Sequence, residues 1–455
     1  MEMVLEFLRD VLSQPALLIG IMSCIGLIAL KRPFHKIMTG TLKPILGYLM
    51  LAAGAGVIVS NLDPLGKMIE HGFHITGVVP NNEAIVAVPQ KVLGVETMSI
   101  LVVGLLMNLC IARFTKFKYV FLTGHHSLFM ACLMSAVLGT AGLSGMELIL
   151  VGGFLMGAWS AISPAIGQSY TSKVTDGDEI AIGHFGSLGY YLSAWVAKYV
   201  GKAEDSTEDI EIPEKWGFLR DSTLSTALTM IVFYLIAAFA AGSEFVATLS
   251  GDMSPYLYAV MSAMNFAVGV TIVYSGVRMI LGDLIPAFQG IATKIIPNAI
   301  PAVDCAVFFT YAPTAVVLGF LSSFIGGIIG MLILGAVGGV LIIPGLVPHF
   351  FCGATAGIYG NATGGRRGAA VGAFLNGLAI TFLPALALPV LGQLGFQNTT
   401  FGDADFAVMG LVLGNAYEWV GMAGIYGIVA IAALVLIIPN FIKTKGKVIN
   451  YVEED

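Results

Sequence analysis

Charged residues are few in this chain, and they stand between long apolar runs. Only 11% of the 455 residues are Asp, Glu, Lys or Arg, against about 25% in a soluble domain. The mean hydropathy is +0.88. Several apolar runs approach or reach the roughly 20 residues that a helix needs to cross a bilayer: residues 16–30, 45–59, 98–111, 224–241 and 425–438. The pattern predicts a protein that crosses a membrane several times.

The expected fold class is an all-α polytopic membrane protein. A bilayer core holds no water to satisfy the backbone, and long unbroken apolar runs favour helices over the short alternating strands of a barrel. We expect about 11 transmembrane helices, some of them broken or re-entrant. Pro and Gly predict the breaks, at residues 63–92, 163–188, 283–313 and 344–365. Unwound backbone at membrane depth must be buried or line a wet cavity, so these breaks should meet around one.

Lys and Arg cluster at three places along the chain, at residues 31–43, 113–118 and 443–447. Basic residues accumulate in cytoplasmic loops. If all three clusters are cytoplasmic, the N-terminus is outside, the C-terminus is cytoplasmic and the number of crossings is odd.

A charged segment divides the chain nearly in half. Residues 201–221 hold ten of the 50 charged residues, which predicts a cytoplasmic linker. We therefore expect a first transmembrane repeat at 1–200, a second repeat with a final helix at 222–442, and a cytoplasmic tail at 443–455. The stretch "ITGVVPNNEAIVAV" from Ile75 resembles "ATKIIPNAIPAVDC" from Ala292. If each half carries five spans, the second is inverted, as in many transporters; chance similarity between apolar stretches is the alternative.

Three polar side chains lie where a buried charge would be costly. His125 is in "TGHHS", His184 is in "IGHF", and Asp304 is in "IPAVDCAVFFTYAP". An ionisable residue inside a membrane segment is expected to face the bundle interior or a cavity. A neutral imidazole can donate and accept hydrogen bonds, which suits a hydroxyl-rich ligand. Interfacial, capping or packing roles remain open for all three, and more so for His126.

The sequence contains no motif that indicates a catalysed reaction. Glu83 follows a Pro-Asn break and is a weaker candidate for the cavity. The sequence contains no phosphate-binding loop, no metal-ligand pair at helical spacing and no Gly-x-Ser-x-Gly elbow, and its five cysteines lie far apart. The net charge of −6 suggests no nucleic-acid partner. We expect a protein that moves a solute, with no catalytic residues, no cofactor and no metal.

Several separated blocks resemble the L-ascorbate permease family, the IIC translocator subunits of the bacterial phosphoenolpyruvate-dependent sugar phosphotransferase system. The resemblance runs over nearly the whole length. The blocks, in order, are "LTGH" at 122–125, "VTDG" at 174–177, "IGH" at 182–184, "STA" at 225–227, "GVRM" at 276–279, "AFQGI" at 287–291, "DCA" at 304–306 and "IIPG" at 342–345.

This resemblance implies a homodimer in the bacterial inner membrane. Each protomer would have a scaffold that forms the dimer interface and a core that binds the sugar and moves against the scaffold, as an elevator does. Partner subunits IIA and IIB would relay phosphate, and the phosphocysteine of IIB would modify the sugar as it emerges. The chain itself would be a transporter subunit and not an enzyme.

The resemblance also assigns site residues. The family's binding histidines fall on His125 and His184, and its binding aspartate falls on Asp304. The family pattern has glutamines where this chain has Phe129 and Phe185, and a Thr-Tyr pair where it has Asn82-Glu83. These four residues are therefore expected at the substrate site as well.

Because aromatic rings replace amide groups, the substrate is left open between ascorbate and a related polyhydroxylated sugar acid or sugar. The alternative function is an ion-coupled secondary transporter of a small polar solute, with Asp304 or Glu83 as the ion site. A membrane-embedded enzyme would need a catalytic set that the sequence does not show.

Overall fold

The computed structural model describes residues 11, 14–74, 77–80, 82, 94–177, 179–210, 222–392 and 399–441. The α-helices of this part are α2 (Pro15–Ala29), α3 (Phe34–Phe73), α5 (Gly94–Phe114), α6 (Gly124–Thr140), α7 (Gly145–Ile166), α8 (Gln168–Thr175), α9 (Ser187–Val200), α10 (Ser222–Ala241), α11 (Ser243–Ser250), α12 (Pro255–Lys294), α13 (Pro313–Ala336), α14 (Leu346–Gly392), α15 (Ala404–Val420) and α16 (Met422–Ile437). Short elements between them are the 3₁₀ helices η2 (Cys305–Thr310) and η3 (Ile438–Phe441) and the strands β1 (Val79–Pro80), β2 (Tyr119–Phe121), β3 (Ala181–Ile182), β4 (Ile300–Val303) and β5 (Thr399–Thr400).

The all-α polytopic class is confirmed. Seven described helices are long and apolar enough to cross a membrane, or eight if the bent pair α10 and α11 forms one span. The expected total of about 11 crossings stays a prediction. Helix α2 is also apolar but shorter, and α14 joins two helices across a kink at Gly364 and Gly365.

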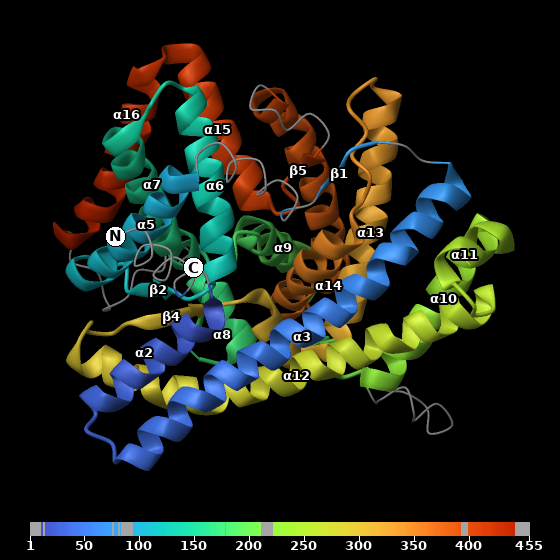
Figure 1. Cartoon of the computed structure of the whole chain (residues 1–455), viewed down its shortest axis with the longest axis horizontal. Helices are drawn as coiled ribbons and strands as arrows, with labels where there is room; N and C mark the ends of the chain where they lie inside the picture. The colour runs from blue at the N-terminus through green and yellow to red at the C-terminus, as the bar shows by residue number, and fades with distance from the viewer. Residues whose placement is uncertain are drawn as a thin grey trace.

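Two helices of 40 residues each, α3 and α12, form a long antiparallel pair. They lie side by side beneath the rest of the molecule, with α2 and α10 against them (Figure 1). Their backbones nearly touch where they cross: a Cβ on Gly276 would lie 2.6 Å from the carbonyl oxygen of Gly47. Small residues allow such close packing in membranes. Equal length and opposite direction are what an inverted repeat would produce.

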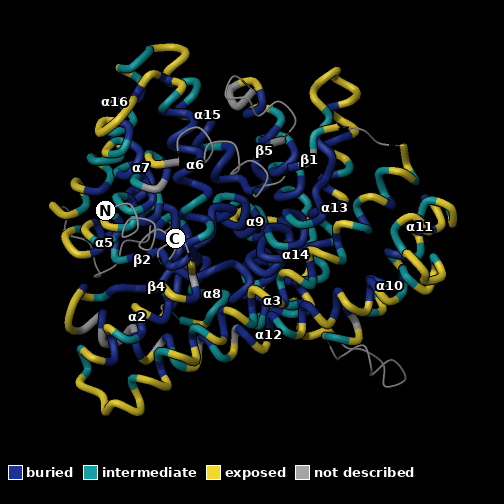
Figure 2. The backbone as a smooth tube through the Cα atoms, in the orientation of Figure 1, coloured by how far each residue is buried: buried dark blue, intermediate teal, exposed yellow. Residues whose placement is uncertain are grey.

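The remaining helices form a second body, whose interior contains most of the fully buried residues (Figure 2). Inside it lie two small parallel sheets. One has the strand order β2-β4-β3; the other joins β1 to β5, and Val78 beside β1 also bridges Ile342. Each sheet thus takes strands from both halves of the chain. The sheets stand on opposite sides of this body, with β2 and β4 at the lower left and β1 and β5 at the upper right of Figure 1.

Three breaks begin later than expected, and the fourth, at 344–365, is mostly helical. Helix α3 continues through Pro64 to Phe73, α7 continues through Pro164 to Ile166, and α12 continues through Pro286 to Lys294. Helix α14 begins at Leu346, and its kink lies only at Gly364 and Gly365. Proline is tolerated inside membrane helices because neighbouring groups satisfy the carbonyl that it frees, so proline alone overestimated these breaks.

The described part of the expected linker packs on the second body. The side chain of Asn361 accepts a hydrogen bond from the N–H of Thr207 at 2.8 Å, and the carboxylate of Glu208 accepts one from the N–H of Thr314 at 3.0 Å. The Glu208 carboxylate therefore lies at the start of α13. Residues 211–221 are outside the described part, and the predicted domain boundaries stay predictions.

Candidate functional site

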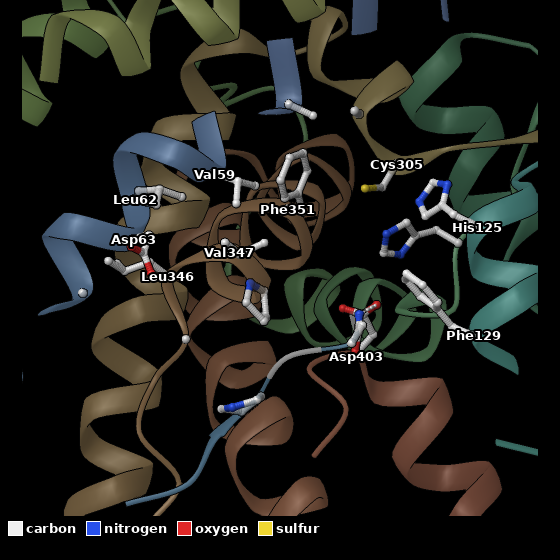
Figure 3. Close-up of a pocket in the computed structure, with 18 of the residues that line it drawn as sticks. Val59, Leu62, Asp63, His125, Phe129, Cys305, Leu346, Val347, Phe351 and Asp403 are labelled. Carbon is white, nitrogen blue, oxygen red and sulfur yellow. Dashed lines mark hydrogen bonds between the residues drawn. The ribbon is translucent and has the colours of Figure 1, made fainter. Parts of the chain in front are cut away.

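A cavity of about 630 Å³ lies between α3 and the second body. One face of α3 forms a wall from Tyr48 to Glu70. The opposite wall comes from the second body, from the starts of α6, α14 and η2 and from the loops that follow the short strands. Val59 and Asp63 lie across the hollow from His125, Phe129 and Asp403 (Figure 3). This volume is in the range of small-molecule sites.

Polar residues that follow the short strands point into this cavity. Asp304 follows β4 directly, and His184 follows β3, His125 follows β2, Asn82 follows β1 and Asp403 follows β5 at slightly greater distances along the chain. In open parallel sheets, ligands bind in the crevice beyond the carboxyl ends of the strands. The two sheets therefore direct their carboxyl ends, and the polar residues that follow them, at one place.

The two carboxylate oxygens of Asp304 contact different partners. One carboxylate oxygen, Oδ1, accepts a hydrogen bond from the N–H of Ala306 at 3.1 Å and caps η2. The other oxygen lies 3.4 Å from Nε2 of His125. The Nδ1 atom of His125 in turn lies 3.2 Å from the hydroxyl oxygen of Tyr48 on α3. A polar chain thus connects the long helix to the second body across the cavity.

His184 is held in one orientation and one tautomer. Its Nδ1 atom accepts a hydrogen bond from the N–H of Gly186 at 3.2 Å and lies 2.8 Å from the hydroxyl oxygen of Tyr190. Because a backbone N–H can only donate, Nδ1 carries no proton, and the proton of the neutral ring is on Nε2. The residue before it must be glycine, since a Cβ on Gly183 would lie 2.4 Å from the carbonyl oxygen of Ala302.

The sequence analysis missed Asp403 and left His126 open. Both are nearly inaccessible to solvent and line the cavity. Asp403 accepts hydrogen bonds from the side-chain amide of Asn82 and from the thiol of Cys352, both at 2.9 Å. The ring of His126 lies 3.8 Å from the ring of His184, and its Nδ1 atom lies 3.4 Å from the N–H of Phe185. The weak internal repeat could have indicated Asp403, because it follows β5 as His184 follows β3.

A further buried acid, Asp405, supports the loop that carries His184. Its carboxylate accepts hydrogen bonds from the hydroxyl of Ser187 at 2.8 Å, from the N–H of Leu188 at 3.0 Å and from the indole of Trp159 at 3.2 Å. The N–H of Leu188 belongs to the first turn of α9, where a carboxylate is favoured. Asp405 therefore joins α15 to the start of α9.

Five of the seven predicted site residues line the same cavity: His125, His184, Asp304, Phe129 and Asn82. Phe185 does not line it, contrary to expectation. Its ring is fully buried and stacks on Phe121 at 4.6 Å, behind His126, because the chain turns there to enter α9. Glu83 lies outside the described residues.

Three overlapping groups of side chains have ligand atoms within 4.8 Å of one another and could hold a metal ion by distance alone. They are His125-His126-Asp304, His126-His184-Asp403 and His184-Asp304-Cys305. However, a metal needs the unprotonated nitrogen of a histidine. In His126 and His184 that nitrogen is Nδ1, which already accepts a backbone N–H. The hydrogen-bond pattern therefore fits a polar ligand better than a metal ion.

The fold and the cavity define a polytopic membrane protein with a polar cavity inside it. Residues 10–405 match the family described as "PTS system sugar-specific permease component", where PTS stands for phosphotransferase system. The chain therefore belongs to this family. It is also similar to a curated relative, the ascorbate-specific PTS system EIIC component of Mycoplasma pneumoniae, with 28% identity over 417 residues. The similarity covers 78% of this chain and 62% of the relative.

Proposed function

We propose that this chain is the translocating IIC subunit of a phosphotransferase-type uptake system for ascorbate or a related polyhydroxylated sugar acid or sugar. The observation that carries the proposal is the convergence of His125, His184 and Asp304 on one cavity in a chain of this family. The named specificity of the Mycoplasma pneumoniae relative supports ascorbate as the first compound to test.

The cavity offers the contacts that a chain of hydroxyl groups requires. His184 presents an Nε2–H donor, while Asp304 presents an acceptor, and each hydroxyl of a sugar both donates and accepts. Phe129, Phe351 and Val59 supply apolar surface between these polar groups. A few fixed polar groups in an otherwise apolar wall are typical of small-molecule sites.

Movement of the second body against the α3–α12 pair would carry the solute across the membrane. The pair would serve as the scaffold of a homodimer, and the second body as the elevator-like core. The position of the cavity at their boundary supports this assignment, because relative movement would open one side and close the other.

The proposed orientation in the bacterial inner membrane has a periplasmic N-terminus and a cytoplasmic C-terminus. The N–H of Lys116 donates to the side chain of Asn440 at 2.9 Å, so the basic segment at 113–118 lies beside the end of η3. The basic cluster at 443–447 follows η3 within a few residues. This proximity supports a shared cytoplasmic side for two of the basic clusters.

Uptake into membrane vesicles tests the proposal. Vesicles containing this chain are loaded with phosphoenolpyruvate, the general phosphotransferase proteins and the IIA and IIB subunits, and are given labelled ascorbate and other sugars. We expect uptake that requires all of these components and a phosphorylated product inside. Uptake driven by an ion gradient alone, with unmodified product, would instead establish the ion-coupled secondary transporter.

A further inference from the structure

The charged residues that line the cavity are mostly acidic. Four of the described lining residues are acidic, and one, Lys67, is basic. Asp63 and Glu70 lie with Lys67 in the last turns of α3. Asp304 lies 3.4 Å from His125, and Asp403 lies 3.9 Å from His126. Lys67 is already paired with Asp63 at 2.7 Å.

The histidines do not offset the two inner carboxylates. A positive charge on His126 or His184 would require a second proton on Nδ1, and that proton would face the N–H of Phe185 or of Gly186. Both rings are therefore neutral in this arrangement. His125 can be charged without such a conflict, because its neighbours are the Tyr48 hydroxyl and the Asp304 carboxylate. At most one imidazolium thus faces two carboxylates.

The side chain of Asp403 acts as a hydrogen-bond acceptor. Its two oxygens accept hydrogen bonds from the side-chain amide of Asn82 and from the thiol of Cys352. Asn82 is fixed in turn, because its side-chain oxygen accepts the N–H of Gly402 at 2.8 Å. The nearest imidazole nitrogen, Nδ1 of His126, is 3.9 Å away, which is too long for a hydrogen bond.

We infer that this site selects an uncharged polyhydroxylated solute, such as a polyol or a neutral sugar, over an anionic sugar acid, and that Asp403 is a specificity-determining residue. The inference rests on the proposed function and narrows it. An anion would bring a further negative charge next to the buried side chains of Asp304 and Asp403, where like charges repel more strongly than in water.

Matched ligands provide the test. Glucitol and gluconate share one carbon chain and carry a hydroxyl and a carboxylate at C1. L-Gulono-1,4-lactone is an uncharged counterpart of the ascorbate anion. Their affinities are measured by calorimetry with the full chain in lipid nanodiscs at neutral pH. The wild type, His184→Ala, Asp403→Asn and, as a control, Asp283→Asn are compared; Asp283 pairs with Lys43 outside the cavity at 3.5 Å.

For the wild type we expect glucitol and the lactone to bind about tenfold or more tightly than their charged counterparts. Asp403→Asn should reduce this preference over the anions by about tenfold, and Asp283→Asn should leave it unchanged. The inference is overturned if gluconate or ascorbate binds as tightly as its uncharged counterpart. It is also overturned if a folded Asp403→Asn variant keeps the wild-type preference. The order of the ligand affinities in the wild type tests the inference without any variant. The test therefore stands even if Asp403→Asn does not fold.

The two proposals can fail separately. Binding that His184→Ala abolishes, with charged ligands preferred, would overturn the neutral-substrate inference and leave the permease proposal standing. Failure of every compound to bind the wild type would overturn both.

Discussion

At the scale of single residues, the site consists of polar side chains that have a structural partner on one side and the cavity on the other. Asp304 caps η2 with one oxygen and faces His125 with the other. His184 accepts a backbone N–H at Nδ1 and lines the cavity. Each of these side chains thus has at least one hydrogen-bond partner in the protein and one polar atom toward the cavity. The protein partner explains how ionisable groups remain in an apolar setting when no ligand is bound.

Replacement of these residues tests the binding role. Asp304→Asn and His184→Ala should each abolish detectable uptake and weaken binding by about 10- to 100-fold, since removing a hydrogen-bond partner from a desolvated site costs roughly 1 to 3 kcal/mol. Labelled-solute uptake and calorimetry measure the two effects, and size-exclusion chromatography should show an unchanged oligomer. Thr39→Ala is a matched control, because Thr39 bonds only its own helix on an exposed surface. Normal uptake by both site variants would exclude these residues from the site.

The sequence predicted Asp304 but not Asp403, and the difference is physical. Asp304 stands inside an apolar stretch, so the sequence itself shows that burying its carboxylate costs free energy. Asp403 follows a polar segment in "FGDADF", where an acid at a membrane interface costs little. Its burial depends on Asn82, 321 positions away, and on the pairing of β1 with β5. No local pattern records such pairings. Phe185 shows the opposite error, because its position beside His184 in sequence does not place its ring in the cavity.

At the scale of elements, two- to four-residue strands position the site. Strands this short have no hydrophobic periodicity, and their partners are distant in sequence: Tyr119 pairs with Ile300, and Ala181 pairs with Ala302. The long helices were predictable from hydropathy, whereas these pairings were not. The sequence did indicate where helices stop, and those stops are where most of the strands lie.

The start of α9 depends on an element from the far end of the chain. Asp405→Ala should leave the donors of Ser187, Leu188 and Trp159 without their acceptor, at a cost of roughly 2 kcal/mol or more. We expect a lower melting temperature and faster hydrogen exchange in residues 183–190. Binding should weaken through displacement of His184.

Hydrogen-exchange mass spectrometry checks this prediction, with Asp283→Asn as the control variant. Unchanged exchange in residues 183–190 of Asp405→Ala would show that Asp405 does not hold this loop.

At the scale of the whole molecule, the α3–α12 pair and the second body meet around the cavity. The composition of the sequence predicted the membrane class and a charged division near residue 201. The assignment of α3 to one body and α6 to the other follows from packing between distant segments, which hydropathy does not record.

A reversible crosslink tests the movement between these bodies. A Cβ on Gly66 of α3 would lie 3.8 Å from Cδ1 of Leu346 of α14. The two bodies therefore approach closely there, and Gly66→Cys/Leu346→Cys is the pair to test for a disulfide between them. Oxidation should stop uptake, and reduction should restore it, because the core could no longer move against the scaffold. Each single-cysteine variant under the same oxidation is the control. Full uptake by the crosslinked protein would contradict the elevator-like mechanism.

Cryo-electron microscopy of the full chain with its tightest-binding solute tests the central claim most directly. We expect density for the solute in the cavity, within hydrogen-bonding distance of both His184 and Asp304 and close to His125. Density for the solute at another place, with these three side chains directed away from it, would contradict the account.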